Sequence, residues 1–135
     1  MYKFPKNSAK VIIAHSNKVL LIKRRILDPY APGRWDIPGG GSDHDDEPPV
    51  ETAARELEEE IGHIIIPQDI ELFERELIKK RNREYHRHCF VYNSESQFSP
   101  KLSKEHSEHK WMSLTEIEQT NLPEHYKLVC RKILL

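Results

Sequence analysis

One short stretch of the chain, residues 41–62, carries an arginine and several glutamates at helical spacing, directly after a run of glycines. Its apolar residues recur every three to four positions, which predicts a helix with one buried face: Val50, Ala53, Ala54, Leu57 and Ile61. Glu56, Glu59 and Glu60 would then share a patch on the opposite, exposed face. Like charges at this spacing repel by roughly 0.2–0.5 kcal/mol per pair, and a bound cation would reverse that sign. Carboxylate oxygens so placed suit Mg²⁺ or Mn²⁺.

The stretch resembles the Nudix box, written G-x5-E-x7-R-E-U-x-E-E-x-G-U with U an apolar residue. The box would span residues 41–63, and its required positions are occupied by Gly41, Glu47, Arg55, Glu56, Leu57, Glu59, Glu60 and Gly62. His63 departs from the pattern, because an apolar residue is usual at that position. Similarity continues through WDIPGG at 35–40 and WMSL at 111–114, so it covers most of the chain. The chain therefore resembles the MutT-like Nudix hydrolases.

The resemblance implies a role for each charged residue of the box. Glu56 and Glu60, one helical turn apart, would bind the metal ion. Glu59 would join them or accept a contact from Arg55. Arg55 would orient these carboxylates, and Glu47 would brace Arg55 from the loop.

The resemblance also implies a backbone ligand from Gly40, which lies just ahead of the box. Its carbonyl would complete the inner metal shell, since only a bare backbone can come so close. The competing interpretation is a solvated helix in which Arg55 pairs with Glu51 and Glu59, four residues away on either side. The match to the box favours the metal site.

A further metal-binding carboxylate is implied by similarity to MutT-type nucleotide pyrophosphohydrolases. In that group a late-loop glutamate six residues before a tryptophan is a metal ligand, and here Glu105 precedes Trp111 by that spacing. Glu108 lies in the same predicted loop and is the competing candidate. The alternative is that both glutamates are ordinary solvated loop residues.

Basic residues and histidines outside the box are weaker candidates for function. Arg24 and Arg25, near the end of the second predicted strand, would help to hold a nucleotide. The basic residues within 79–83 are more typical of a solvated hairpin tip. The histidine pairs 86/88 and 106/109 have spacings that zinc can use, but no cysteine pair or His-Glu helix motif accompanies them. Solvated or substrate-facing histidines are therefore favoured.

Length and composition indicate one globular domain over residues 1–135. Charged residues make up 32% of the chain and apolar ones 37%, and the net charge is −1. This balance argues against general attraction to nucleic acid, and no run of ~20 apolar residues predicts a membrane helix. Cys89 and Cys130 are expected to be free buried thiols, which fits a cytoplasmic protein. A monomer or homodimer is expected.

The hydrophobic pattern predicts strands at residues 9–14, 19–22, 35–37, 64–66, 70–78 and 85–92. Short helices are expected after Ser113 and near the C-terminus after residue 121. Asp45 or Asp46 would cap the helix of the box, and Gly62 would end it. The alternation of strands and helices predicts an α/β protein with a mixed sheet. The resemblance implies the Nudix α/β/α sandwich, with the box as a loop–helix–loop.

The function implied is Mg²⁺-dependent hydrolysis of the diphosphate linkage in a nucleoside triphosphate or a related nucleoside diphosphate derivative. Alternatives are an ADP-ribose or sugar-nucleotide pyrophosphatase, or a Nudix-fold module that binds a nucleotide or RNA without turnover. The intact carboxylate set favours the enzyme, because a binding module does not need that charge repulsion. The residues at 77–80 carry neither the proline of ADP-ribose hydrolases nor the tyrosine of dinucleoside polyphosphate hydrolases.

Overall fold

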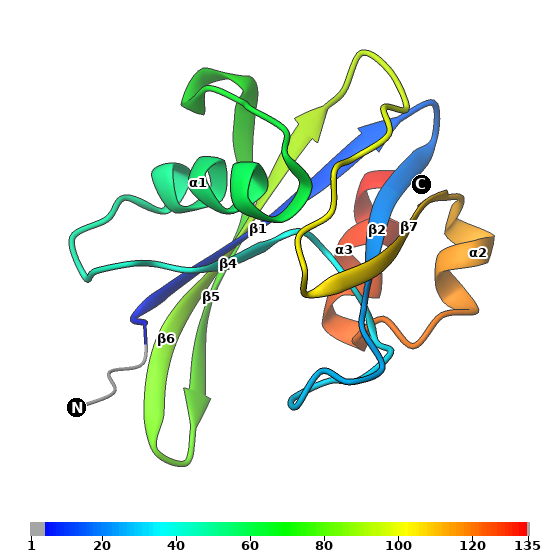
Figure 1. Cartoon of the computed structure of the whole chain (residues 1–135). Coiled ribbons are helices and arrows are strands. Elements are labelled where there is room, and N and C mark those ends of the chain that lie inside the picture. Colours follow the sequence, from blue (N-terminus) through cyan, green and yellow to red (C-terminus); the bar gives the residue numbers. More distant parts are fainter. Residues whose placement is uncertain (1–4, 135) are drawn as a thin grey trace.

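A mixed β-sheet forms the centre of the computed structural model, which describes residues 5–134, and helices cover both of its faces (Figure 1). The elements follow in the order β1 (Asn7–His15), β2 (Lys18–Arg24), β3 (Trp35–Asp36), β4 (Gly39–Gly41), α1 (Pro49–Ile61), the 3₁₀ turn η1 (Pro67–Asp69), β5 (Ile70–Lys80), β6 (Arg83–Asn93), β7 (His106–Met112), α2 (Leu114–Glu118) and α3 (Glu124–Leu134).

The sheet opens along one edge of β1. Its strand order is β3-β2-β1-β6-β5, with β1 and β6 parallel from Asn7↔His86 to Ala14↔Asn93. On the other edge β1 pairs with β2 only at its end, through residues 14–15, and with β4 through residues 8–10. The direct β1–β2 ladder therefore stops after two residue pairs, and further along β2 pairs with β3 on the same edge and with β7 on the opposite edge.

Alternation of side chains along the strands produces two apolar layers, one on each face of the sheet. The layer under α1 contains Ala9, Val11, Ile13, Leu20, Ile22, Ala53, Leu57, Ile61, Ile65, Ile70 and Phe90. The layer under α2 and α3 contains Ile12, Val19, Leu21, Ile37, Cys89, Met112, Ile117, Leu122, Tyr126, Val129 and Cys130. The predicted α/β/α arrangement with a mixed sheet is confirmed.

The ends of α1 only partly follow the predictions. Gly62 ends the helix in the left-handed conformation, at φ 65°, and its N–H donates to the Glu58 carbonyl, as predicted. The prediction of an Asp45 or Asp46 cap is wrong, because Pro48 occupies the N-cap position without a side-chain hydrogen bond. Pro49 begins the helix with a φ already suited to it and has no N–H that needs a partner.

Other local predictions are wrong where pairing between distant residues decides the structure. Residues 64–66 form no strand, because only Ile65 enters the core while Ile64 and Ile66 remain exposed. The glycines at 39–41, expected in a loop, form β4 by pairing with β1. The predicted late loop becomes β7 from His106 onward, because it pairs along the edge of β2 opposite to β1 and β3.

Two further expectations concern thiols and membranes. Cys89 and Cys130 are both buried and free, as predicted. Burial raises the pKa of the Cys89 thiol to about 11 and that of Cys130 to about 12, so both are unreactive at neutral pH. Among residues 5–134, no helix has the length and apolar character needed to cross a membrane.

Candidate active site

Arg55 connects the loop of the box to α1. Its guanidinium donates two hydrogen bonds to the Glu47 carboxylate, both 3.1 Å long, and a third of 2.9 Å to the Gly41 carbonyl. It also contacts Glu56 at 3.0 Å and Glu59 at 3.4 Å. The contact between Glu47 and Arg55 that the resemblance implied is therefore present, and Arg55 lies where it can orient the glutamates beside it.

Glu47 is the most strongly stabilised carboxylate of the box. The hydrogen bonds from Arg55 lower its pKa to about 2, against the effect of burial. Thr52 Oγ1 donates to the same carboxylate at 2.6 Å, and the Asp43 N–H donates at 3.1 Å. These groups saturate Glu47 with donors, so it braces the loop and has little capacity left for a metal ion.

The glycine strand β4 lies directly against two glutamates of α1. The Gly39 N–H donates a 2.6 Å hydrogen bond to Glu60 Oε1. A Cβ atom on Gly40 would lie only 2.6 Å from the Glu56 carboxyl carbon, so a larger residue there would displace that side chain. The site needs a glycine at this position because the carboxylate approaches the backbone so closely.

The three glutamates predicted to share one exposed patch lie in different environments. Glu59 is exposed and faces Arg55. Glu60 is only 8% exposed, because its carboxylate lies against Gly39 of β4 and beside His106 of β7. The prediction of an exposed Glu60 is therefore wrong.

Positive charge compensates the burial of the two inner carboxylates only in part. Burial raises the pKa of Glu60 to about 7, although Lys10 opposes the shift, and it raises the pKa of Glu56 although Arg55 opposes that shift. Lys10 cannot compensate both, since its ammonium group already lies 3.3 Å from Asp36 and 3.0 Å from the Ile37 carbonyl. A divalent cation fits this donor set, because it would supply the charge that the buried carboxylates lack.

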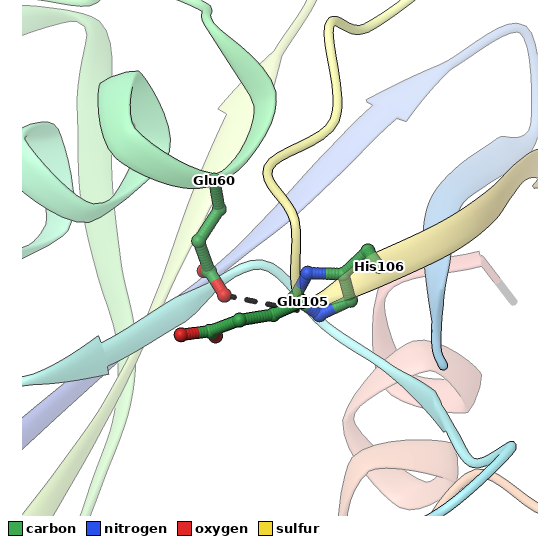
Figure 2. A group of neighbouring side chains, drawn as sticks. All are labelled: Glu60, Glu105 and His106. Atoms are coloured by element: carbon green, nitrogen blue, oxygen red, sulfur yellow. Dashed lines mark ion pairs between the residues drawn. The ribbon is translucent and has the colours of Figure 1, made fainter. Parts of the chain in front are cut away.

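Glu105 lies beside Glu60, and Glu108 does not. Ligand atoms of Glu60, Glu105 and His106 all lie within 4.8 Å of one another (Figure 2). Glu108 instead pairs with Lys23 at 3.3 Å on the exposed side of β7. The geometry thus favours the first of the two predicted late glutamates.

His106 was not predicted as a site residue, because the sequence favoured solvated or substrate-facing histidines. It is 2% exposed, and burial together with the nearby Arg24 lowers its pKa to about 4. The predicted metal ligand Glu105 is its neighbour in the sequence and could have indicated a role for His106. The strand that turns His106 inward, however, was not predicted. His109 is exposed, and the His86 and His88 rings, 6.4 Å apart, belong to no metal-binding group among residues 5–134.

An open cleft of about 650 Å³ continues from the glycine strand on the α3 side of the sheet. Its lining is strongly basic and includes Lys10, Arg24, Arg34, Arg87 and one buried acid, Asp36. Burial opposes ionisation of Asp36, but Lys10, the Ile37 N–H and Arg24 together outweigh it and lower the pKa of that carboxyl.

The two arginines predicted to hold the substrate are placed differently. Arg24 lines the cleft and pairs with Asp28 at 3.0 Å. Arg25 does not line it, and instead its N–H and side chain donate to the carbonyls of Glu105 and Lys104. Arg25 therefore secures the segment that carries Glu105.

Comparison with known families identifies the class. The profile of the NUDIX domain family matches residues 5–132, so the chain belongs to the Nudix family. Together with a sheet that matches MutT structures and an intact set of box carboxylates, this makes it a MutT-like Nudix hydrolase, an enzyme that acts on phosphoric anhydrides.

Individual relatives agree over nearly the whole chain. The chain is 29% identical to the 8-oxo-dGTP diphosphatase of Escherichia coli (strain K12) over 122 residues, which cover 90% of this chain and 91% of the relative. The MutT protein from Methanosarcina mazei Go1 superposes with a TM-score of 0.73 at 26% identity, over 98% of this chain and 95% of that one. The NUDIX domain of Shewanella oneidensis NrtR, solved with ADP ribose, superposes with a TM-score of 0.73 at 23% identity, over 99% of this chain and 91% of that one. At this identity the match supports the shared fold and nothing more.

Proposed function

We propose that this protein, acting as one Nudix domain over residues 1–135, is a Mg²⁺- or Mn²⁺-dependent pyrophosphohydrolase. Its substrate would be a nucleoside triphosphate or a related nucleoside diphosphate derivative. The observation that carries the proposal is a pair of carboxylates, buried Glu60 and half-buried Glu56, held against the bare backbone of β4 at the edge of a basic cleft. We expect a monomer or homodimer in solution.

The chemistry of a diphosphate bond explains why these groups would be needed together. Phosphate oxygens repel incoming hydroxide, so the site must neutralise charge and orient a water molecule. A bound divalent ion would supply both effects. Glu56, Glu60 and Glu105 would hold the ion, with the Gly40 carbonyl as a further ligand. Arg55 would keep Glu56 and Glu59 in place.

The cleft supports a nucleotide as the substrate. Lys10 and Arg24 lie between the carboxylates and the cleft, where they could contact phosphate oxygens. Tyr126 adds an aromatic wall, and Asp36 adds a buried acceptor that could meet the edge of a base. The relative that is an 8-oxo-dGTP diphosphatase favours a nucleoside triphosphate over a sugar nucleotide.

Turnover separates the enzyme from a binding module with the same fold. Purified protein would be tested with Mg²⁺ or Mn²⁺ against nucleoside triphosphates, oxidised dGTP, ADP-ribose, sugar nucleotides and dinucleoside polyphosphates. We expect hydrolysis of at least one nucleotide and its loss in excess EDTA. Undiminished turnover after confirmed metal removal would reject the metal-dependent mechanism. Binding of a nucleotide without turnover by the folded, metal-loaded protein would favour the binding module.

A further inference from the structure

His106 is a buried polar side chain whose hydrogen-bonding groups are unused. It begins β7, its side chain is 0% exposed, and neither ring nitrogen has a hydrogen-bond partner within residues 5–134. Leaving such a group unpaired costs about 1–3 kcal/mol, and native proteins rarely accept that cost without a ligand or a functional reason. The unpaired ring therefore suggests that a ligand binds beside it.

The ring faces Glu60 across a space that no hydrogen bond spans. His106 Nε2 lies 3.9 Å from Glu60 Oε2, which is too long for a hydrogen bond (Figure 2). The other oxygen of Glu60 already accepts from Gly39, so Oε2 is the one directed toward the ring. Two ligand atoms that each lie ~2.1 Å from one ion can be up to ~4.2 Å apart. The observed separation fits a shared ion better than a direct contact.

Glu105 completes a group of three at the same place. One of its carboxylate oxygens lies within 4.8 Å of ligand atoms of both Glu60 and His106, on an exposed side chain that can adjust. Two oxygens and an imidazole nitrogen form a mixed ligand set. Imidazole binds first-row transition ions well, whereas Mg²⁺ prefers oxygen ligands alone and gives up its water reluctantly.

We propose that His106 is itself a metal ligand and that it makes this site prefer a first-row transition ion, such as Mn²⁺ or Co²⁺, to Mg²⁺. The proposal rests on the proposed function for the location of the ion, but it concerns the binding of the ion and needs no turnover. The competing possibility is that His106 only positions Glu60 and does not contact the ion. The two differ in whether nitrogen enters the coordination shell.

Calorimetric titration of the metal-free protein with Mg²⁺, Mn²⁺ or Co²⁺, without nucleotide, tests the selectivity. We expect wild type to bind Mn²⁺ and Co²⁺ at least ~10-fold more tightly than Mg²⁺. His106→Gln, which substitutes an amide for the ring, should weaken Mn²⁺ and Co²⁺ by ~10-fold or more and change Mg²⁺ by less than ~3-fold. His109→Gln, on the exposed side of the same strand, should behave as wild type. Equal loss for all three ions would overturn the proposal.

Pulsed electron paramagnetic resonance of the Mn²⁺-loaded protein tests the nitrogen ligand directly. We expect a nitrogen hyperfine coupling in wild type and in His109→Gln, and its absence in His106→Gln. A wild-type spectrum without that coupling would overturn the proposal, even if the His106 variant failed to fold. Coupling in a protein that hydrolyses no nucleotide would preserve the ligand assignment while rejecting the proposed function.

Discussion

Glu60 is a buried carboxylate whose ionisation is opposed by burial. One of its oxygens is held by the Gly39 N–H, the other faces His106, and burial raises its pKa to about 7. Lys10, the cation that most strongly opposes this shift, is already paired with Asp36. An ionised Glu60 is therefore unfavourable in the metal-free protein and favourable with a divalent ion beside it.

Glu60→Gln should separate activity from stability. We expect kcat at saturating metal to fall at least ~10²-fold, because a ligand that stabilises the transition state is lost. A raised carboxyl pKa contributes stability that is complete below its ordinary value and is lost as pH rises through about 7. The variant should therefore be as stable as wild type, or more stable, at pH 8 in EDTA.

Steady-state kinetics and thermal unfolding in EDTA provide the two measurements for this variant. Glu58→Gln, on the exposed side of α1, is the matched control and should leave the rate unchanged. A metal-free Glu60 variant that melts below wild type at pH 8 would favour a structural salt-bridge role for Glu60.

Glu47 should have the opposite dependence on pH. Its pKa is lowered to about 2 by Arg55, so its contribution is present above the ordinary value of 4.5 and is lost as pH falls through about 2. We expect Glu47→Gln to reduce the free energy of unfolding by about 2 kcal/mol at pH 7, and by much less near pH 2.5. Denaturant titrations at both pH values would measure this. A cost that does not depend on pH would mean that packing, and not the charge pair, is responsible.

Glu105 and Glu108 form a matched pair of substitutions on the same segment. Glu105→Gln should lower metal affinity and the rate together, because its carboxylate lies with Glu60. Glu108→Gln should change both much less, since that residue pairs with Lys23 at the surface. Metal titration and kcat measurements on both variants decide between them. The reversed order of effects would assign the late carboxylate to Glu108.

At the scale of elements, β4 positions the carboxylates of α1. Pairing with β1 holds residues 39–41 extended and rigid, so a backbone N–H reaches Glu60 and a bare Cα meets Glu56. A flexible glycine loop would present the same groups only part of the time. Helix α1 thus provides the carboxylates, and contacts with β4 fix the positions of Glu56 and Glu60.

Gly40→Ala should therefore impair the site more than the fold. Its Cβ would lie 2.6 Å from the Glu56 carboxyl carbon, the movable end of a side chain, so Glu56 would be displaced. We expect a loss of at least ~10-fold in kcat/KM with a small change in melting temperature. Gly41→Ala, whose Cβ would meet Pro5 at the same distance of 2.6 Å, is the control for crowding on this strand. Equal losses from both substitutions would contradict a specific role for Gly40.

At the scale of the whole molecule, β4 connects the proposed metal site to the cleft. Elements α1, β4 and β7 meet at Glu60, which accepts from Gly39 of β4 and lies near His106 of β7. Gly40 and Gly41 also line the basic cleft on the α3 side. A substrate in that cleft would reach the carboxylates with its inner phosphates first.

This arrangement predicts which bond breaks. With a nucleoside triphosphate as substrate, the products should be the monophosphate and pyrophosphate. Water labelled with heavy oxygen should place the label in the nucleoside monophosphate, because attack occurs at the sugar-bearing phosphorus. Mass spectrometry of both products measures its position. Label in the pyrophosphate would require the substrate to lie in the opposite orientation.

The sequence by itself determined the helix of the box, its glycine end, the α/β class and the family. These features depend on residues close together in the chain, since helical and strand periodicities and the φ of Gly62 are local properties. The preference for Glu105 over Glu108 came from resemblance to MutT-type enzymes, through its spacing to Trp111, and it stays a prediction. Local patterns were enough to identify which residues carry charge and on which element.

Only the tertiary structure decided which of the charged and polar residues lie next to one another in the site. Glu60 is buried because Gly39, 21 positions away, arrives on a strand that pairs with β1. His106 turns inward because it starts the strand that pairs with β2 on the edge opposite to β1, at Arg24↔His106. Residues 64–66 stay outside the sheet although their composition suits a strand. Such outcomes depend on pairing between distant segments, which residue periodicity does not encode.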